Sequence, residues 1–358
     1  MTLTTAVADA NTLAAKTTGT ITGTISEGDA ATLVTLNETT NAYTITVTDS
    51  SVSAANLSTL DGLTSVAVAV NSTTLTGSTS DVTAIYNANT AGTISGLGNE
   101  AVTIDDTSLA ATALNTLNGL TTGVVNAGTV TTLTGLAADA NTAYVANSAG
   151  TISGLGNEAV TLSDTSITST VLNTLDGNTS GAVNAATVLT LTGTVSTINT
   201  AYASSGITGL GNEALTISDT SVAADALNTA NTNTSGTVTV QATTVTGSAG
   251  DLVTAYAAQG SGIEGLGNEA ITASGTASVS QVNTLGTAST GTLTATVTEG
   301  DMSTLAGISE SGNALTITVT DTSIASDALN TLDGKTTVAV TVNSSTITGT
   351  NSDLIAAY

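Results

Sequence analysis

Apolar and polar residues alternate in short runs along the whole chain. Residues 44–48 read Thr-Ile-Thr-Val-Thr, and residues 315–320 read Leu-Thr-Ile-Thr-Val-Thr. Alternation with β-branched residues predicts half-buried β-strands. A short segment bearing Ala and Leu follows each run, as in Val222–Leu227, and predicts a short helix. Because such helices are too short to be stable alone, neighbouring segments must hold them.

A helix-start signal follows many of the predicted strands. Ser or Thr stands there with an Asp three residues further on, which is the spacing of a capping box. The pairs are Ser26 with Asp29, Ser78 with Asp81, Ser248 with Asp251, Thr298 with Asp301, and Thr350 with Asp353. A Gly-containing return then leads to the next strand. The predicted unit is strand, corner, short helix and return.

Three landmarks recur in a constant order. Gly-Leu-Gly-Asn-Glu begins at Gly96, Gly154, Gly209 and Gly265, in steps of 58, 55 and 56 residues. Asp-[Thr/Ser]-Ser begins at Asp49, Asp106, Asp164, Asp219 and Asp321. Leu-[Asn/Ser]-Thr-Leu-[Asp/Asn]-Gly begins at Leu57, Leu114, Leu172 and Leu329, with degenerate copies at Leu227 and Val282. A fixed period of this kind is the signature of a solenoid or an array.

Each long repeat contains two similar halves. Type A coils carry Asp after the strand, and type B coils carry Gly there, at Gly77, Gly135, Gly193, Gly247 and Gly349. We expect a right-handed parallel β-solenoid with one main sheet, short helical turns and about 26–30 residues per coil. Residues 1–358 would form one elongated domain, a fragment of a longer repeat protein. The alternative is a tandem array of small β/α domains of about 56 residues, which are marginal alone.

Composition excludes most catalytic and nucleic-acid-binding sites. The 358 residues include no His, Cys, Trp, Phe or Pro, and Lys16 and Lys335 are the only basic residues. Nucleophilic triads need an imidazole, and zinc or copper sites need thiolate or imidazole ligands. A nucleic-acid surface needs clustered positive charge, whereas the formal charge is -25. We therefore expect a protein that is not an enzyme and binds no nucleic acid.

No segment of the sequence is apolar over a length that spans a bilayer, so we expect no membrane insertion. The first residues lack the positive region and continuous apolar stretch of a secretory signal. If the chain is exported, that signal would lie elsewhere.

The recurring acids are candidates for caps or for metal ligands. We expect Asp49, Asp106, Asp164, Asp219 and Asp321 to be solvated corners and helix caps, with calcium binding as the alternative. No other cofactor is indicated. Gly-Leu-Gly-Asn-Glu-Ala has the letters of a dinucleotide fingerprint, but a strand follows it and it occurs four times. A tight structural turn is therefore expected there.

Asn and Tyr also recur at fixed places. We expect a buried Asn ladder in which each amide bonds the backbone of the next coil. Its members are Asn115, Asn141, Asn173, Asn199, Asn228, Asn283 and Asn330. Tyr ends the type B helix segments, where we expect the ring to pack and the hydroxyl to reach water. These residues are Tyr86, Tyr144, Tyr202, Tyr256 and Tyr358.

The combined pattern Gly-Leu-Gly-Asn-Glu-Ala-Val-Thr, then Asp-Thr-Ser, then Leu-Asn-Thr-Leu-[Asp/Asn]-Gly resembles the repeats of giant surface or secreted proteins of marine cyanobacteria and some of their phages. The resemblance implies an extracellular or cell-surface setting and no catalytic residues. A structural role in a fibre, surface layer or matrix follows. The alternative is an adhesin or an ice-binding module, because regular Thr-x-Thr arrays on a solenoid resemble those of ice-binding proteins.

The ends of the chain suggest a partner. A solenoid without polar caps presents an unpaired strand edge at each end, which can pair with another chain. Residues 2–5 are compatible with a strand, and residues 353–358 form a helical segment after which a coil is unfinished. We expect head-to-tail association of the chain with itself, or binding to other surface components.

Overall fold

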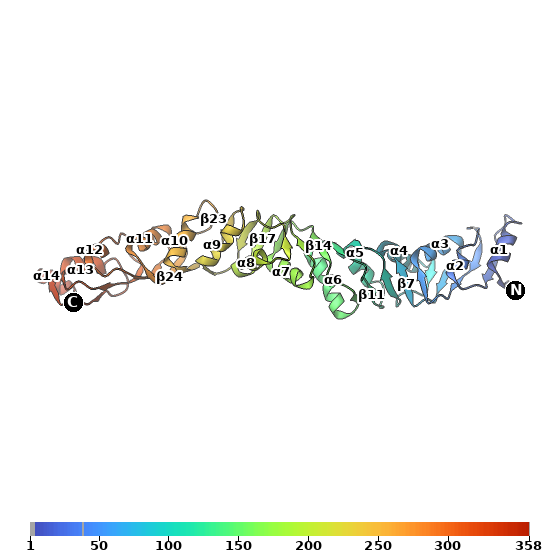
Figure 1. The fold of residues 1–358 in the computed structure, drawn as a ribbon, viewed down its shortest axis with the longest axis horizontal. Coiled ribbons are helices and arrows are strands. Elements are labelled where there is room, and N and C mark those ends of the chain that lie inside the picture. Colours follow the sequence, from blue (N-terminus) through green and yellow to red (C-terminus); the bar gives the residue numbers. More distant parts are fainter. Residues whose placement is uncertain (1–3, 38, 358) are drawn as a thin grey trace. The chain divides into compact units, whose positions relative to one another are not determined.

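Short strands and short helices follow one another through the computed structural model, which describes residues 4–37 and 39–357 (Figure 1). Internal contacts group the chain into two compact units. Unit 1 comprises Met1–Asp164 with Thr174–Ala185, and unit 2 comprises Thr165–Asn173 with Ala186–Tyr358. The expectation of one elongated domain stays a prediction.

The helices are short, as the sequence predicted. They are α1 (Val7–Ala14), α2 (Ala30–Leu33), α3 (Ala54–Leu63), α4 (Thr79–Ala91), α5 (Ala111–Asn118), α6 (Ala137–Ala149), α7 (Ser169–Asn178), α8 (Val195–Ala203), α9 (Ala224–Asn233), α10 (Ala249–Ala257), α11 (Val279–Ala288), α12 (Met302–Leu305), α13 (Ser326–Asp333) and α14 (Asn351–Ala357). Two to three strands separate most of them, and we call each group of strands with its following helix a coil.

The strands of unit 1 form successive parallel sheets. They are β1 (Thr4–Thr5), β2 (Thr22–Ile25), β3 (Ala42–Thr44), β4 (Thr46–Val47), β5 (Ser51–Ser53), β6 (Val68–Val70), β7 (Thr74–Gly77), β8 (Ile94–Ser95), β9 (Ala101–Ile104), β10 (Ser108–Ala110), β11 (Val125–Asn126), β12 (Thr132–Gly135), β13 (Ile152–Ser153), β14 (Ala159–Leu162) and β16 (Val183–Asn184). The strand orders are β1-β2-β3, β4-β6-β8, β5-β7-β9-β11-β13 and β10-β12-β14-β16.

Unit 2 repeats this arrangement. Its strands are β15 (Ser166–Thr168), β17 (Thr190–Gly193), β18 (Ile207–Thr208), β19 (Ala214–Ile217), β20 (Ser221–Ala223), β21 (Val238–Val240), β22 (Thr244–Ser248), β23 (Ile263–Glu264), β24 (Ala270–Ala277), β25 (Leu293–Val297), β26 (Ala314–Thr316), β27 (Thr318–Val319), β28 (Ser323–Ala325), β29 (Thr341–Val342) and β30 (Thr346–Thr348). The orders are β15-β17-β19-β21-β23, β20-β22-β24-β25-β26, β27-β29 and β28-β30.

Strands of one coil pair in parallel with those of the next coil. In the β7–β9 pair, Leu75 lies opposite Val102 and Thr76 opposite Thr103. Leu75 and Val102 are fully buried, so the alternating pattern places one face of each strand in the core. The chain therefore has a repeat, solenoid-like arrangement of short parallel strands with helices between them.

Two predictions about local structure are wrong. We expected one main sheet, but corners split the strands of a coil between different sheets, as at Asp105 and Asp106 between β9 and β10. Residues 222–223 belong to β20 rather than to a helix, because Val222 faces the core beside Val245 of β22. A strand residue at this point lets the parallel ladder run up to the first residue of α9.

The predicted helix starts are confirmed in part. The hydroxyls of Ser78, Ser248 and Thr350 accept hydrogen bonds from the backbone N–H three residues on, as expected for an N-cap. At α2 and α12 the predicted caps are wrong. Asp29 and Asp301 are themselves the N-caps there, and each accepts from the third N–H of its helix.

Candidate functional site

The five recurring aspartates each hold the start of a helix in the preceding coil. In every case Oδ2 accepts a hydrogen bond from the backbone N–H of the helix's first residue. The distances are 2.7 Å from Ala30 to Asp49, 2.6 Å from Thr79 to Asp106, 2.8 Å from Ala137 to Asp164, 2.7 Å from Val195 to Asp219 and 2.7 Å from Met302 to Asp321. A helix N-terminus has unpaired N–H groups and a partial positive charge, so a carboxylate stabilises it.

Two glutamates that the sequence analysis did not single out do the same. Glu27 accepts from the N–H of Val7, at the start of α1, and Glu299 accepts from Val279, at the start of α11. Both lie in a [Ser/Thr]-Glu-Gly-Asp string, at residues 26–29 and 298–301. This duplicated string is the feature of the sequence that could have identified the two glutamates, because Glu precedes Gly-Asp in both copies.

The structure does not bring these acids together as a metal site. Among residues 4–37 and 39–357, no three His, Cys, Asp or Glu side chains are grouped so that they could share a metal ion. Calcium binding by Asp49, Asp106, Asp164, Asp219 or Asp321 stays a prediction.

The Gly that marks type B coils lies at the position of the coil that the capping Asp occupies in type A coils, and it also lies beside a helix start. A Cβ on Gly193 would stand 2.1 Å from Oγ of Ser169, the first residue of α7, and a Cβ on Gly349 would stand 1.9 Å from Oγ of Ser326, the first residue of α13. At these two positions the helix start therefore leaves no room for a side chain in the next coil. At Gly77, Gly135 and Gly247 a positive φ requires glycine instead. The starts of α7 and α13 thus need space at the position of the coil where α4 and α6 receive a carboxylate.

The Glu of Gly-Leu-Gly-Asn-Glu is buried and links neighbouring coils. Glu100, Glu158, Glu213 and Glu269 are at most 1% exposed. Each carboxylate accepts a hydrogen bond from the Gly N–H two residues earlier in the motif and from the hydroxyl of a Tyr on the preceding type B helix. We expected the Tyr to end that helix, but Tyr86 and Tyr144 lie inside α4 and α6. The hydroxyl donors are Tyr86, Tyr144, Tyr202 and Tyr256.

One copy shows the geometry in full. The hydroxyl of Tyr144 lies 3.0 Å from Oε2 of Glu158, and the N–H of Gly156 lies 2.9 Å from the same oxygen. The hydroxyl of Thr179, in the following coil, donates to the backbone carbonyl of Glu158 at 2.7 Å. Burying a carboxylate is costly unless donors surround it, so this cluster ties three successive coils.

We expected the tyrosine hydroxyls to reach water, but those of Tyr86, Tyr144, Tyr202 and Tyr256 bond a carboxylate instead. Tyr358 lies outside the described residues. Tyr86 and Tyr144 are each 3% exposed. Burial, together with the nearby Glu100, raises the pKa of Tyr86 to about 12. Burial likewise raises the pKa of Tyr144, beside Glu158. The phenol is held in its neutral form, in which it can donate.

Within residues 4–37 and 39–357, each type B helix that carries the Tyr is followed by a coil with the Glu, and each that lacks the Tyr is followed by a coil without it. The short helices α2 and α12 end at Leu33 and Leu305, before any Tyr. In the coils that follow them, the place of the Glu, six residues before the capping Asp, is taken by Tyr43 and Leu315. In these two coils, to which the preceding helix supplies no hydroxyl, no carboxylate occupies this position.

The remaining part of the motif is a tight turn, as predicted. Gly96 has a φ of +96°, and Gly98 has a φ of +137°. A Cβ on Gly96 would stand 2.4 Å from the carbonyl oxygen of Val70 in the preceding coil. Glycine is required there by the backbone conformation and by the close approach of two coils.

The Asn ladder is confirmed in its contacts. Each amide Nδ2 donates to a backbone carbonyl in the helix or turn of the next coil, at 2.8 to 3.0 Å. The donors are Asn115, Asn173, Asn199, Asn228, Asn283 and Asn330. The Oδ1 of Asn141 accepts a hydrogen bond from the Nδ2 of Asn178 at 2.9 Å. The side chains are half-buried on the helices rather than buried at a turn, which is where we placed them.

Comparison with known proteins gives little further information. No family model matches the chain, and no curated protein matches it. The chain is similar to one chain of the crystal structure of the Rad7 and Elc1 complex in yeast, at 12% identity and a TM-score of 0.20, covering 96% of this chain and 85% of that chain. A likeness at this TM-score carries no argument. In the part of the chain that the structure describes, no helix is both long and apolar enough to cross a bilayer.

Proposed function

We propose that this chain is a non-catalytic structural repeat protein of an extracellular fibre, surface layer or matrix. The observation that supports it is how the recurring polar residues are used. The aspartates cap helices of the preceding coil, the glutamates bond its tyrosines, and the asparagines bond the backbone of the next coil. These side chains hold coil to coil, as a scaffold requires.

We further propose that the coils wind as a right-handed β-solenoid in one elongated domain. Parallel strands joined by crossovers are almost always right-handed. The extracellular or cell-surface setting is proposed on the resemblance to giant surface proteins. An experimental structure showing antiparallel hairpins or separate small domains would contradict the architecture.

Self-association is the proposed mode of assembly. Within the described residues, β1 pairs with β2 alone and β30 pairs with β28 alone, so a strand of another copy can pair at the free edge of each. The formal charge of -25 would oppose lateral clumping, and divalent cations would weaken that repulsion.

Negative-stain microscopy and light scattering of the full chain test this proposal, with calcium or with a chelator. Filaments that lengthen with protein concentration are expected. Particles that stay monomeric at high concentration in both conditions would refute self-assembly and leave the role of a spacer.

The regular Thr surface favours one alternative, an adhesin or ice-binding module. In unit 2, Thr192, Thr216 and Thr239 lie in register on adjacent strands. Neighbouring strands are about 4.8 Å apart, so their hydroxyls form a regular row. Inhibition of ice recrystallisation, or binding on a glycan array, would support this function over the purely structural one.

A further inference from the structure

The only two basic residues of the chain occupy the same position of two coils. Lys335 is the sixth residue after Leu329, where one copy of the Leu-Asn-Thr-Leu landmark begins. Lys16 is the sixth residue after Ala10, where a degenerate copy, Ala-Asn-Thr-Leu, begins. We call this place in the coil the donor position. In the other copies of the landmark it holds Leu63, Leu120, Asn178, Asn233 and Ala288.

Polar side chains at the donor position bond the preceding coil. Three of them donate a hydrogen bond to a residue on, or just after, the helix of the coil before their own. The bonds are 2.9 Å from Nδ2 of Asn178 to Oδ1 of Asn141, 3.4 Å from Nδ2 of Asn233 to Oδ1 of Asn199, and 3.1 Å from Nζ of Lys335 to the carbonyl oxygen of Ser309. A side chain at the donor position therefore ties its coil to the coil before it.

The residue that accepts this bond also has a fixed place. Asn199 and Ser309 each lie two residues after a carbonyl that accepts a bond of the Asn ladder, those of Thr197 and Gly307. We call this place the acceptor position. In the last helix, α14, the ladder carbonyl belongs to Asp353, two residues before Ile355. Ile355 is therefore the residue that a donor position of a following coil would contact.

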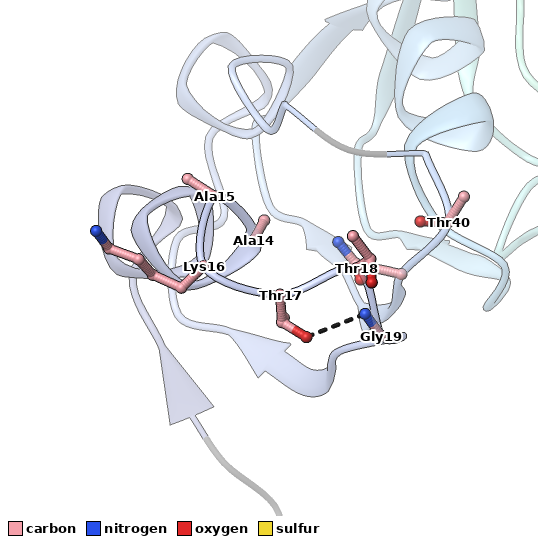
Figure 2. A pocket seen from close by; sticks show the side chains of 8 residues that line it. Ala14, Ala15, Lys16, Thr17, Thr18, Gly19 and Thr40 are labelled. Carbon is pink, nitrogen blue, oxygen red and sulfur yellow. Dashed lines mark hydrogen bonds between the residues drawn. The ribbon is translucent and has the colours of Figure 1, made fainter.

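One donor position and one acceptor position lack their counterpart in the described chain. Ile355 is 80% exposed, because no described coil follows α14. Lys16 is exposed, and its ammonium makes no hydrogen bond within residues 4–37 and 39–357. Figure 2 shows the hollow beside the turn after α1, with the Lys16 side chain pointing away from Thr40, which belongs to a following coil.

These two positions are complementary in charge and shape. α14 carries Asp353 in its first turn and no basic residue. The carbonyls of its last turn, including that of Ile355, lack helical partners and carry a partial negative charge. A lysine can lay its apolar stem along Ile355 while its ammonium reaches such a carbonyl, as Lys335 reaches that of Ser309.

We propose that Lys16 of one copy of this chain binds Ile355 on α14 of a second copy. The stem of the lysine packs on the isoleucine, and Nζ donates to the carbonyl oxygen of Ile355. The inference rests on the self-association proposed above and adds the residues and the direction of the contact. Because each copy offers one such donor and one such acceptor, the contact is heterologous and repeats from copy to copy.

Charge reversal tests the contact in the full chain. Lys16→Glu places like charges opposite Asp353, and Ile355→Lys places like charges opposite Lys16. Each single variant should therefore raise the protein concentration needed for filaments at least about tenfold, measured by sedimentation. The Lys16→Glu/Ile355→Lys double variant again opposes unlike charges, so it should assemble within about threefold of the wild-type concentration.

Two controls carry the same charge changes elsewhere. Lys335→Glu changes the other donor position, whose partner lies within the chain, and Val145→Lys changes an apolar helix residue that is 67% exposed. Both should assemble at about the wild-type concentration. Should a charge-reversal variant lose its folded circular dichroism spectrum, Lys16→Gln and Ile355→Ala decide in its place, because both side chains are exposed.

Each outcome separates this contact from self-association itself. Single variants that assemble like the wild type, a double variant that is not restored, or controls that are equally impaired would overturn the contact and leave self-association standing. A wild-type chain that stays monomeric would refute self-association and this contact with it. Loss in both single variants with recovery in the double variant supports the contact.

Discussion

Replacing Tyr144 by Phe removes one donor from a buried carboxylate and leaves the ring in place. Glu158 then keeps the N–H of Gly156, at 2.9 Å, as the remaining donor to Oε2. Hydrogen bonds to charged groups contribute about 1.5–3 kcal/mol, so Tyr144→Phe should lower the free energy of unfolding by about that amount. Because Glu158 is 0% exposed, water cannot replace the hydroxyl without rearrangement.

A double-mutant cycle isolates the pair. Glu158→Gln keeps the volume of the side chain and removes its charge, and together with Tyr144→Phe it should show a coupling energy of about 1–2 kcal/mol. Urea unfolding followed by far-UV circular dichroism measures each variant. Val145→Ala is the control, since Val145 lies on the same helix and is 67% exposed. Equal stability of Tyr144→Phe and Val145→Ala, or a coupling energy of zero, would refute the reasoning.

Further predictions address the caps, the close approach of coils, and pH. Asp106→Asn should cost about 1 kcal/mol of unfolding free energy in urea, because it weakens the cap of α4, whereas the exposed neighbour Asp105→Asn should cost under about 0.5 kcal/mol. Gly181→Ala should cost about 1–3 kcal/mol, because its Cβ would stand 2.3 Å from the carbonyl oxygen of Glu158. Gly177→Ala should leave the unfolding free energy unchanged or raise it, because Gly177 lies in a helix and its Cβ would meet open space. A larger loss of stability for Gly177→Ala than for Gly181→Ala would contradict the packing. The pKa of Tyr86 rises from 10.0 to about 12 on folding, so its contribution to stability is present below pH 10 and is lost as pH rises through 12. The absorbance of ionised tyrosine at 295 nm should therefore rise together with unfolding. Ionisation of the tyrosines near pH 10 while the circular dichroism spectrum stays that of the folded protein would contradict this, because it would show that the hydroxyls are in water.

The sequence predicted the parts of this protein that depend on local pattern. Alternating Thr and apolar residues specified short strands, and the regular recurrence of Asp106, Asp164 and their equivalents specified a repeat. The Asn contacts between coils were also predicted, because an amide at a fixed place in a stack has the next coil's backbone as its nearest partner. Each of these inferences needs only neighbours in sequence and the fact of stacking.

The tertiary structure decided which coil each polar side chain serves. A capping Asp follows its own strand in sequence, yet Asp106 stabilises a helix that begins 27 residues earlier, at Thr79. Tyr144 and Glu158 are 14 residues apart, and nothing in the local pattern of either shows that both are buried. The sequence by itself determined the repeat and its two kinds of coil. The role of each Asp, Glu and Tyr depends on how the coils stack. Stacking determines whether a side chain is buried and which helix start it faces, and the residue's own sequence neighbours do not.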